Sequence, residues 1–255
     1  MLMKKLFTLL AVAAVALGAH AQNTLTVCEG LYYSNASPIC GMYADTEGTM
    51  TQTIYPADIL AEMSGKQITD LTFYTLADYY FSQGQESTDA TDYINFENAT
   101  LQLSLLEVDQ LGFEQAVAVD GVTPVATVTP TKGDYMMTFS LDQPFVYKGG
   151  NLLVEVKVIT PGTWGQTYFL GEGTEDYNPG YYHIDDQEDV NSFFPKATFA
   201  FEDVLTGITG INETAVASVK YVNLNGQTSD KPFKGVNVKV MTRTDGTTTS
   251  TKVVF

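Results

Sequence analysis

The feature that most constrains the fold is the alternation of apolar and polar side chains along much of the chain. Large apolar residues occupy every second position in 71–73, 101–105, 135–141 and 152–158. Successive side chains of a β-strand point to opposite faces, so each segment predicts a strand with one buried face. Such strands bury their apolar faces best when two antiparallel sheets pack together. We therefore predict an all-β fold, a β-sandwich or jelly roll, over residues 22–205.

One short helix is expected beside these strands. The segment 55–65 has Pro56 near its first turn and Gly65 at its end, which is typical of a helix of two to three turns. It would close one end of the sandwich.

Residues 206–255 differ in character from the rest of the chain. They contain more Thr, Lys and Asn and fewer large aromatic residues. The turn dipeptides Asn225-Gly226 and Asp245-Gly246 divide them into three predicted strands. We therefore expect a separate, small, three-stranded C-terminal β domain.

The first 21 residues have the pattern of a secretory signal peptide. Lys4 and Lys5 precede an uncharged apolar run, and Ala19-His20-Ala21 supplies a small-x-small cleavage motif. The apolar run is shorter than the roughly 20 residues that span a bilayer. We expect cleavage before Gln22 and no transmembrane segment afterwards; an uncleaved anchor helix is the alternative.

The charge balance excludes several classes of partner. The 255 residues carry a net charge of −17, and without Lys4 and Lys5 the charge becomes −19. Nucleic acid and anionic membranes attract basic surfaces, so neither is an expected partner. After cleavage His183 is the only histidine, which leaves little for imidazole-based catalysis.

The C-terminal residues resemble the sorting domains of type IX secretion substrates of Gram-negative bacteria. The resemblance rests on Tyr221–Gln227, Lys234–Val238, Asp245-Gly246 and Lys252–Val254, in that order. It implies a secreted or outer-surface location and recognition by type IX-like export machinery. An ordinary β appendage is the alternative.

The preceding residues are similar to jelly-roll modules of secreted bacterial proteins related to the cleaved adhesins. The matching segments are 53–74, 101–105, 139–154 and 194–199. The resemblance implies binding or adhesion and brings no catalytic residues with it.

Two cysteines, Cys28 and Cys40, are the only thiols in the chain. Disulfides form in oxidising compartments, so export favours a bond between them. Two free buried cysteines are the alternative. A metal site with His183 would need a further ligand.

An acidic segment, 172–189, is a candidate calcium site. Calcium binds six to eight oxygen atoms in tolerant geometry, but the segment lacks the spacing of an EF-hand. The alternative is a solvated acidic loop, and Asp89 with Asp92 form a second, weaker candidate. The proposed ligands are Asp176, Asp185, Asp186 and Asp189.

Aromatic residues crowd the predicted loops near these carboxylates. Aromatic rings cover the apolar faces of sugars and carboxylates accept hydrogen bonds from sugar hydroxyls, although the same rings could cap the sandwich core. The candidate ligand-binding residues are Trp164, Tyr177, Tyr181 and Tyr182, and further loop aromatics are Tyr79, Tyr80, Phe81 and Tyr168.

The sequence therefore favours a non-enzymatic, adhesin-like protein that binds a glycan or a host or matrix protein at the cell surface. Two alternatives stay open. A secreted hydrolase needs only a pair of carboxylates to cleave glycans, and nothing in the sequence selects such a pair. A structural surface protein would have no small ligand at all.

Overall fold

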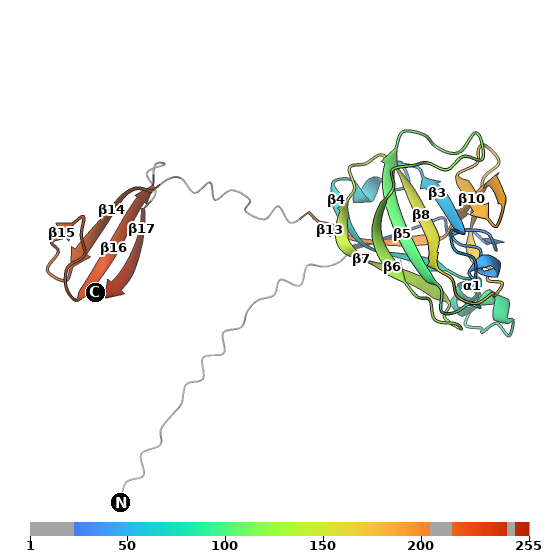
Figure 1. Ribbon diagram of the computed structural model, residues 1–255, viewed down its shortest axis with the longest axis horizontal. Coiled ribbons are helices and arrows are strands. Elements are labelled where there is room, and N and C mark those ends of the chain that lie inside the picture. The colour runs from blue at the N-terminus through green and yellow to red at the C-terminus, as the bar shows by residue number, and fades with distance from the viewer. Residues whose placement is uncertain (1–22, 205–215, 244–247, 255) are drawn as a thin grey trace, which may run out of the picture. The chain divides into compact units, whose positions relative to one another are not determined.

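The computed structural model describes residues 23–204, 216–243 and 248–254, and these form mostly β-strands (Figure 1). The contacts divide the chain into two compact units, one up to Val204 and one from Leu205. The all-β prediction is confirmed. The predicted signal peptide, 1–21, lies outside the described residues.

The first unit contains two large antiparallel sheets and a small one within its described residues. The four-stranded sheet has the order β1 (Asn23–Val27), β13 (Ala197–Asp203), β4 (Lys66–Tyr74), β7 (Met136–Val146). The six-stranded sheet has the order β11 (Gln187–Asn191), β10 (Gly180–Ile184), β3 (Met50–Tyr55), β8 (Asn151–Thr160), β5 (Thr100–Val108), β6 (Thr123–Val128). The small sheet has the order β12 (Phe193–Pro195), β9 (Phe169–Gly173), β2 (Tyr32–Ser34).

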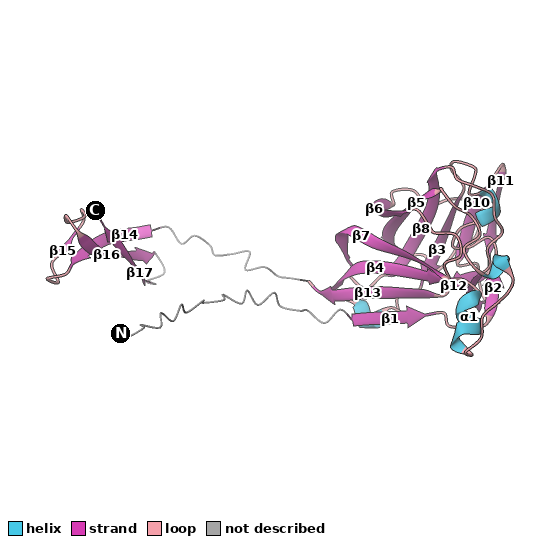
Figure 2. Ribbon diagram, turned by 90° about the horizontal axis from the view of Figure 1, so that it is seen from below, coloured by secondary structure: helices cyan, strands magenta, loops and turns pink. Residues whose placement is uncertain are grey.

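The two large sheets pack face to face, and the main core lies between them (Figure 2). The alternating apolar residues of each sheet point into this core, as the sequence predicted. Tyr55 crosses it and donates a hydrogen bond from its hydroxyl to the carbonyl oxygen of Pro195, at 2.8 Å. The largest fully buried core side chains from the two sheets include Phe73, Phe139, Phe199, Phe201 and Tyr55.

The helix expected at 55–65 is wrong in position. Tyr55 ends strand β3, and turns follow it up to the 3₁₀ helix η2 (Ala61–Met63). These ten connecting residues run from one large sheet to the other and bury both Leu60 and Met63. The short α-helix is instead α1 (Ala77–Ser82), and two more 3₁₀ helices are η1 (Gly41–Tyr43) and η3 (Ala90–Asp92).

The expected disulfide between Cys28 and Cys40 is also wrong, because both cysteines are free. Cys28 follows β1 and packs against the main core, next to Glu172. Cys40 precedes η1 and lies next to Tyr182 of β10. The two thiols therefore lie in different surroundings. Burial, with a smaller effect of Glu172, raises the pKa of Cys28 to about 12, and burial also raises the pKa of Cys40.

The second unit is a single antiparallel sheet of four strands rather than the three expected, because the two-residue strand β15 (Thr228–Ser229) adds to its edge. Its order is β15, β14 (Val216–Asn223), β16 (Val236–Arg243), β17 (Thr248–Val254). Two paired asparagines, Asn223 and Asn237, hold its turns. Asn223 accepts hydrogen bonds from the backbone amides of Asn225 and Gln227, and Asn237 bonds both backbone groups of Phe233. Side-chain hydrogen bonds of this kind fix local turns without an apolar core.

We predict that the unfolded, unreduced protein contains two titratable thiols. In the folded protein at pH 8 both should react slowly with a disulfide reagent, because the reactive thiolate is scarce when the pKa is raised. Since the pKa of Cys28 is higher in the folded chain, its contribution to stability is complete below about pH 9 and is lost as the pH rises toward 12.

The measurement is a thiol count before and after denaturation, with Cys40→Ser as the control that should leave one thiol. A count of zero in unfolded wild type would contradict the free cysteines.

Candidate functional site

The four aromatic residues that the sequence selected do not share one site. Trp164 is 61% exposed on the segment that joins β8 to β9. Tyr177 packs its ring edge-on against Phe194. Tyr181 is only 1% exposed. Tyr182, the next residue of β10, points to the opposite face of the strand and lines a hollow there.

The four acidic residues selected as calcium ligands are also separated. Asp176 precedes β10, whereas Asp185 and Asp186 follow it, and a five-residue strand spans about 17 Å. Asp189 lies in β11 opposite Tyr182 and, after burial, is the largest cause of the raised pKa of that tyrosine. Within the described residues, no group of three or more His, Cys, Asp and Glu side chains is arranged to hold a metal ion.

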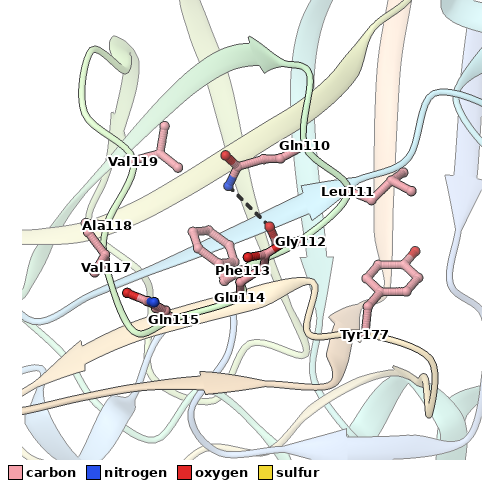
Figure 3. Close-up of a pocket in the computed structure, with 10 residues that line it drawn as sticks. All are labelled: Gln110, Leu111, Gly112, Phe113, Glu114, Gln115, Val117, Ala118, Val119 and Tyr177. Atoms are coloured by element: carbon pink, nitrogen blue, oxygen red, sulfur yellow. Dashed lines mark hydrogen bonds between the residues drawn. The ribbon is translucent and has the colours of Figure 1, made fainter.

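A hollow of about 690 Å³ lies along the loop between β5 and β6 (Figure 3). Its wall is formed by this one loop together with Tyr177, and Leu111 and Val117 are its exposed apolar side chains. Leu111 and Tyr177 lie on one side of the loop's turn, and Val117 lies on the other (Figure 3). The lining is therefore mostly apolar side chains and main chain of a single segment.

This loop covers the outer face of the six-stranded sheet and forms a second, smaller core there. Phe113 packs against Tyr181, together with Ile54 and Leu153. Beside them the buried amide of Gln52 donates to Glu155 at 2.7 Å and exchanges two hydrogen bonds with the backbone of Val119. The main role of the loop is thus to close the sheet face.

A second hollow, of about 470 Å³, has a different character. It lies at the end of the sandwich where Figure 2 places β2 and α1. Three tyrosines from three distant segments line it: Tyr33 of β2, Tyr80 of α1, and Tyr168 just before β9. The rings of Tyr33 and Tyr168 meet edge to face, with centroids 5.1 Å apart. We call this hollow the tyrosine pocket.

Backbone hydrogen bonds hold the walls of the tyrosine pocket together. The amide of Leu76 donates to the carbonyl of Tyr168, and the amide of Tyr168 donates to the carbonyl of Thr91, each at 2.8 Å. Gly165 lets the segment before Tyr168 pass close to the main chain, because a Cβ there would overlap the carbonyl of Asn95. The pocket is therefore held on a fixed framework.

Polar groups line the rest of the tyrosine pocket. Asp89 accepts hydrogen bonds from the amide and hydroxyl of Thr91, and these bonds lower its pKa. Asp92 is buried and accepts a hydrogen bond from the hydroxyl of Ser87. The pocket thus presents oriented carboxylates and hydroxyls beside aromatic rings.

Sequence reasoning found part of this pocket. Tyr80 and Tyr168 were among the aromatic residues of the predicted loops, whereas Asp89 and Asp92 were predicted only as a weaker calcium site. Tyr33 was missed, because a tyrosine in a short strand gives no sign that its ring is exposed. Only the fold brings these segments together.

Comparison with known proteins gave no match to any protein-family model and no significant match to a curated protein. Among the described residues, no helix is long and apolar enough to cross a membrane.

We predict that Gln52→Ala loosens the loop that covers the six-stranded sheet. The substitution removes the bonds to Val119 and leaves Glu155, which is 6% exposed, without its amide donor. The free energy of unfolding should fall by about 1–3 kcal/mol.

Denaturant unfolding measures this loss, and hydrogen exchange at the amide of Val119 should accelerate. Gln110→Ala is the matched control, because its amide bonds only Gly112 at the surface, and it should change stability by less than about 0.5 kcal/mol. Equal effects of the two variants would contradict the prediction.

Proposed function

We propose that this protein is a secreted, non-catalytic surface protein that binds carbohydrate in the tyrosine pocket. The observation that carries the proposal is the convergence of Tyr33, Tyr80 and Tyr168 on one hollow with Asp89 and Asp92. Aromatic rings pack on the apolar faces of sugars, and the carboxylates accept hydrogen bonds from sugar hydroxyls.

Two features favour binding over hydrolysis in this pocket. A general acid in a glycosidase needs a raised pKa, whereas hydrogen bonds from Thr91 lower the pKa of Asp89. The amide and hydroxyl of Thr91 donate hydrogen bonds to Asp89, and the hydroxyl of Ser87 donates one to Asp92, which suits fixed acceptors. We therefore assign both carboxylates to ligand binding.

We further propose that the C-terminal unit directs export through type IX-like machinery. Its own sheet and its asparagine-held turns support a role separate from the sandwich. Among residues 218–242 and 248–253 of this unit, for which burial is described, Asn237 is the only buried residue. Such a sheet suits recognition by another protein better than support of a ligand pocket.

The binding proposal predicts that Tyr80→Ala weakens oligosaccharide binding about tenfold, because it removes one ring from the pocket. A glycan array followed by calorimetry on the best ligand would measure this. Trp164→Ala is the matched control, since Trp164 is an exposed aromatic residue that lines none of the hollows described above.

Trp164→Ala should leave the affinity unchanged. Binding that depends on Trp164 and not on Tyr80 would move the site to the segment between β8 and β9 and would refute the assignment. Absence of binding to any glycan would refute the function itself.

The export proposal predicts that deletion of 207–255 leaves a folded sandwich trapped in the periplasm. Residues 23–203 should keep the circular dichroism and melting temperature of the full chain, because the two units form separate contacts. Cell fractionation measures the location. Attachment of 205–255 to an unrelated periplasmic protein is the complementary test, and normal export of the truncated chain would contradict the role.

A further inference from the structure

Another hollow lies next to the tyrosine pocket, and one residue lines both. This hollow measures about 340 Å³, and Tyr32 and Tyr33 of β2 form its wall together with residues after β9 and before β12. Its polar lining is Thr174, Glu175 and Ser192. Tyr33 lines the tyrosine pocket as well. Both volumes fall in the range of ligand pockets, roughly 300–1,000 Å³.

The strand between the two hollows is unusually exposed. Leu31, Tyr32 and Tyr33 are 67%, 69% and 57% exposed, although apolar surface of this kind is normally covered. Strand β2 lies at the edge of its small sheet, with β9 as its only partner among the described strands. Tyr32 and Tyr33 both line the adjoining hollow, and of the two only Tyr33 also lines the tyrosine pocket.

We propose that the two hollows are consecutive subsites of one cleft that crosses β2, and that its ligand is an extended oligosaccharide of neutral or amino sugars. This inference rests on the proposed carbohydrate binding and specifies its ligand. Because Tyr33 lines both hollows, a single oligosaccharide chain that passes over Tyr33 can contact Tyr80 in the tyrosine pocket and Tyr32 in the adjoining hollow.

The charge of the cleft selects the sugar class. The tyrosine pocket contains Glu86, Asp89 and Asp92, the adjoining hollow contains Glu175, and no lysine or arginine lines either hollow. Residues 22–204 as a whole carry 27 acidic residues against 5 basic ones. These carboxylates would repel a uronate or sulfate group, whereas they would accept hydrogen bonds from a hydroxyl or an ammonium group.

Hydroxyl-rich walls favour a sugar chain over a peptide strand added to the edge of β2. Ser87, Thr88 and Thr91 line the tyrosine pocket, and Thr174 and Ser192 line the adjoining hollow. A peptide paired with β2 would use main-chain hydrogen bonds and would need apolar pockets for alternate side chains. The mixed aromatic and polar lining on both sides of the strand fits pyranose rings better.

The experiment measures affinity for oligomers of two lengths and three charges by calorimetry on the full mature chain. The probes are 1,4-linked dimers and hexamers of glucose, N-acetylglucosamine, glucosamine and galacturonic acid. Galacturonic acid is α-linked and the other three sugars are β-linked. We expect at least one neutral or amino hexamer to bind roughly tenfold more tightly than its dimer, because the dimer fills one subsite only. Galacturonic acid oligomers should bind most weakly.

Two variants separate this inference from the proposed function. Tyr80→Ala should lower the affinity for both the dimer and the hexamer. Tyr32→Ala should lower the affinity for the hexamer to about that for the dimer and leave the affinity for the dimer unchanged. Leu31→Ala is the matched control, because Leu31 is as exposed as Tyr32 but lines neither hollow. Glu175→Gln should weaken the glucosamine hexamer more than the N-acetylglucosamine hexamer.

Each of the following outcomes would overturn one part of the proposal. If Tyr80→Ala weakens binding but Tyr32→Ala does not, carbohydrate binding stands and the extended cleft is refuted. Equal affinity for dimer and hexamer refutes the cleft in the same way. Preference for galacturonic acid refutes the charge selection. If no oligomer binds, both the cleft and the proposed function fail.

Discussion

The burial of one face of each large sheet against the other is the interaction on which the rest of this structure depends. Apolar side chains at alternate positions of β4, β7 and β13 meet those of β3, β5 and β8, and the main core forms between them. The outer face of the six-stranded sheet is closed as well, by the loop between β5 and β6 through Phe113 and Gln52. The faces of this sheet are therefore occupied by packing, which leaves the ends of the sandwich for the binding site that we propose.

At one end this constraint brings together segments that are far apart in the chain. The connections after β4 and before β9, together with the short strand β2, meet around the tyrosine pocket. Backbone hydrogen bonds from Leu76 to Tyr168 and from Tyr168 to Thr91 link these connections, so the main chain that carries the rings and carboxylates is held together. Such preorganisation lowers the entropic cost of binding. In the proposed carbohydrate binding, the acidic surface of the same unit would act on specificity, because it repels anionic ligands.

Sequence patterns predicted the elements better than their contacts. Alternation located the strands because the two-residue period follows directly from strand geometry. The prediction of a helix at 55–65 was wrong because Leu60 and Met63 reach the core through turns. The α-helix α1 instead formed in a segment whose sequence has no strong helix-start signal. The disulfide failed because two cysteines near in sequence took up different surroundings, Cys28 at the main core and Cys40 beside Tyr182. Proximity in sequence does not set the direction of a side chain.

The sequence by itself determined the all-β class, the acidic charge and the change of character near residue 205, since each depends on composition or local period. Only the tertiary structure decided which aromatic residues share a site. Tyr181 and Tyr182 are adjacent in sequence and lie on opposite faces of β10, whereas Tyr33, Tyr80 and Tyr168 are distant and line one pocket. The physical reason is that strand pairing and sheet packing are long-range contacts, and they alone place the connections that carry Tyr80 and Tyr168 beside Tyr33.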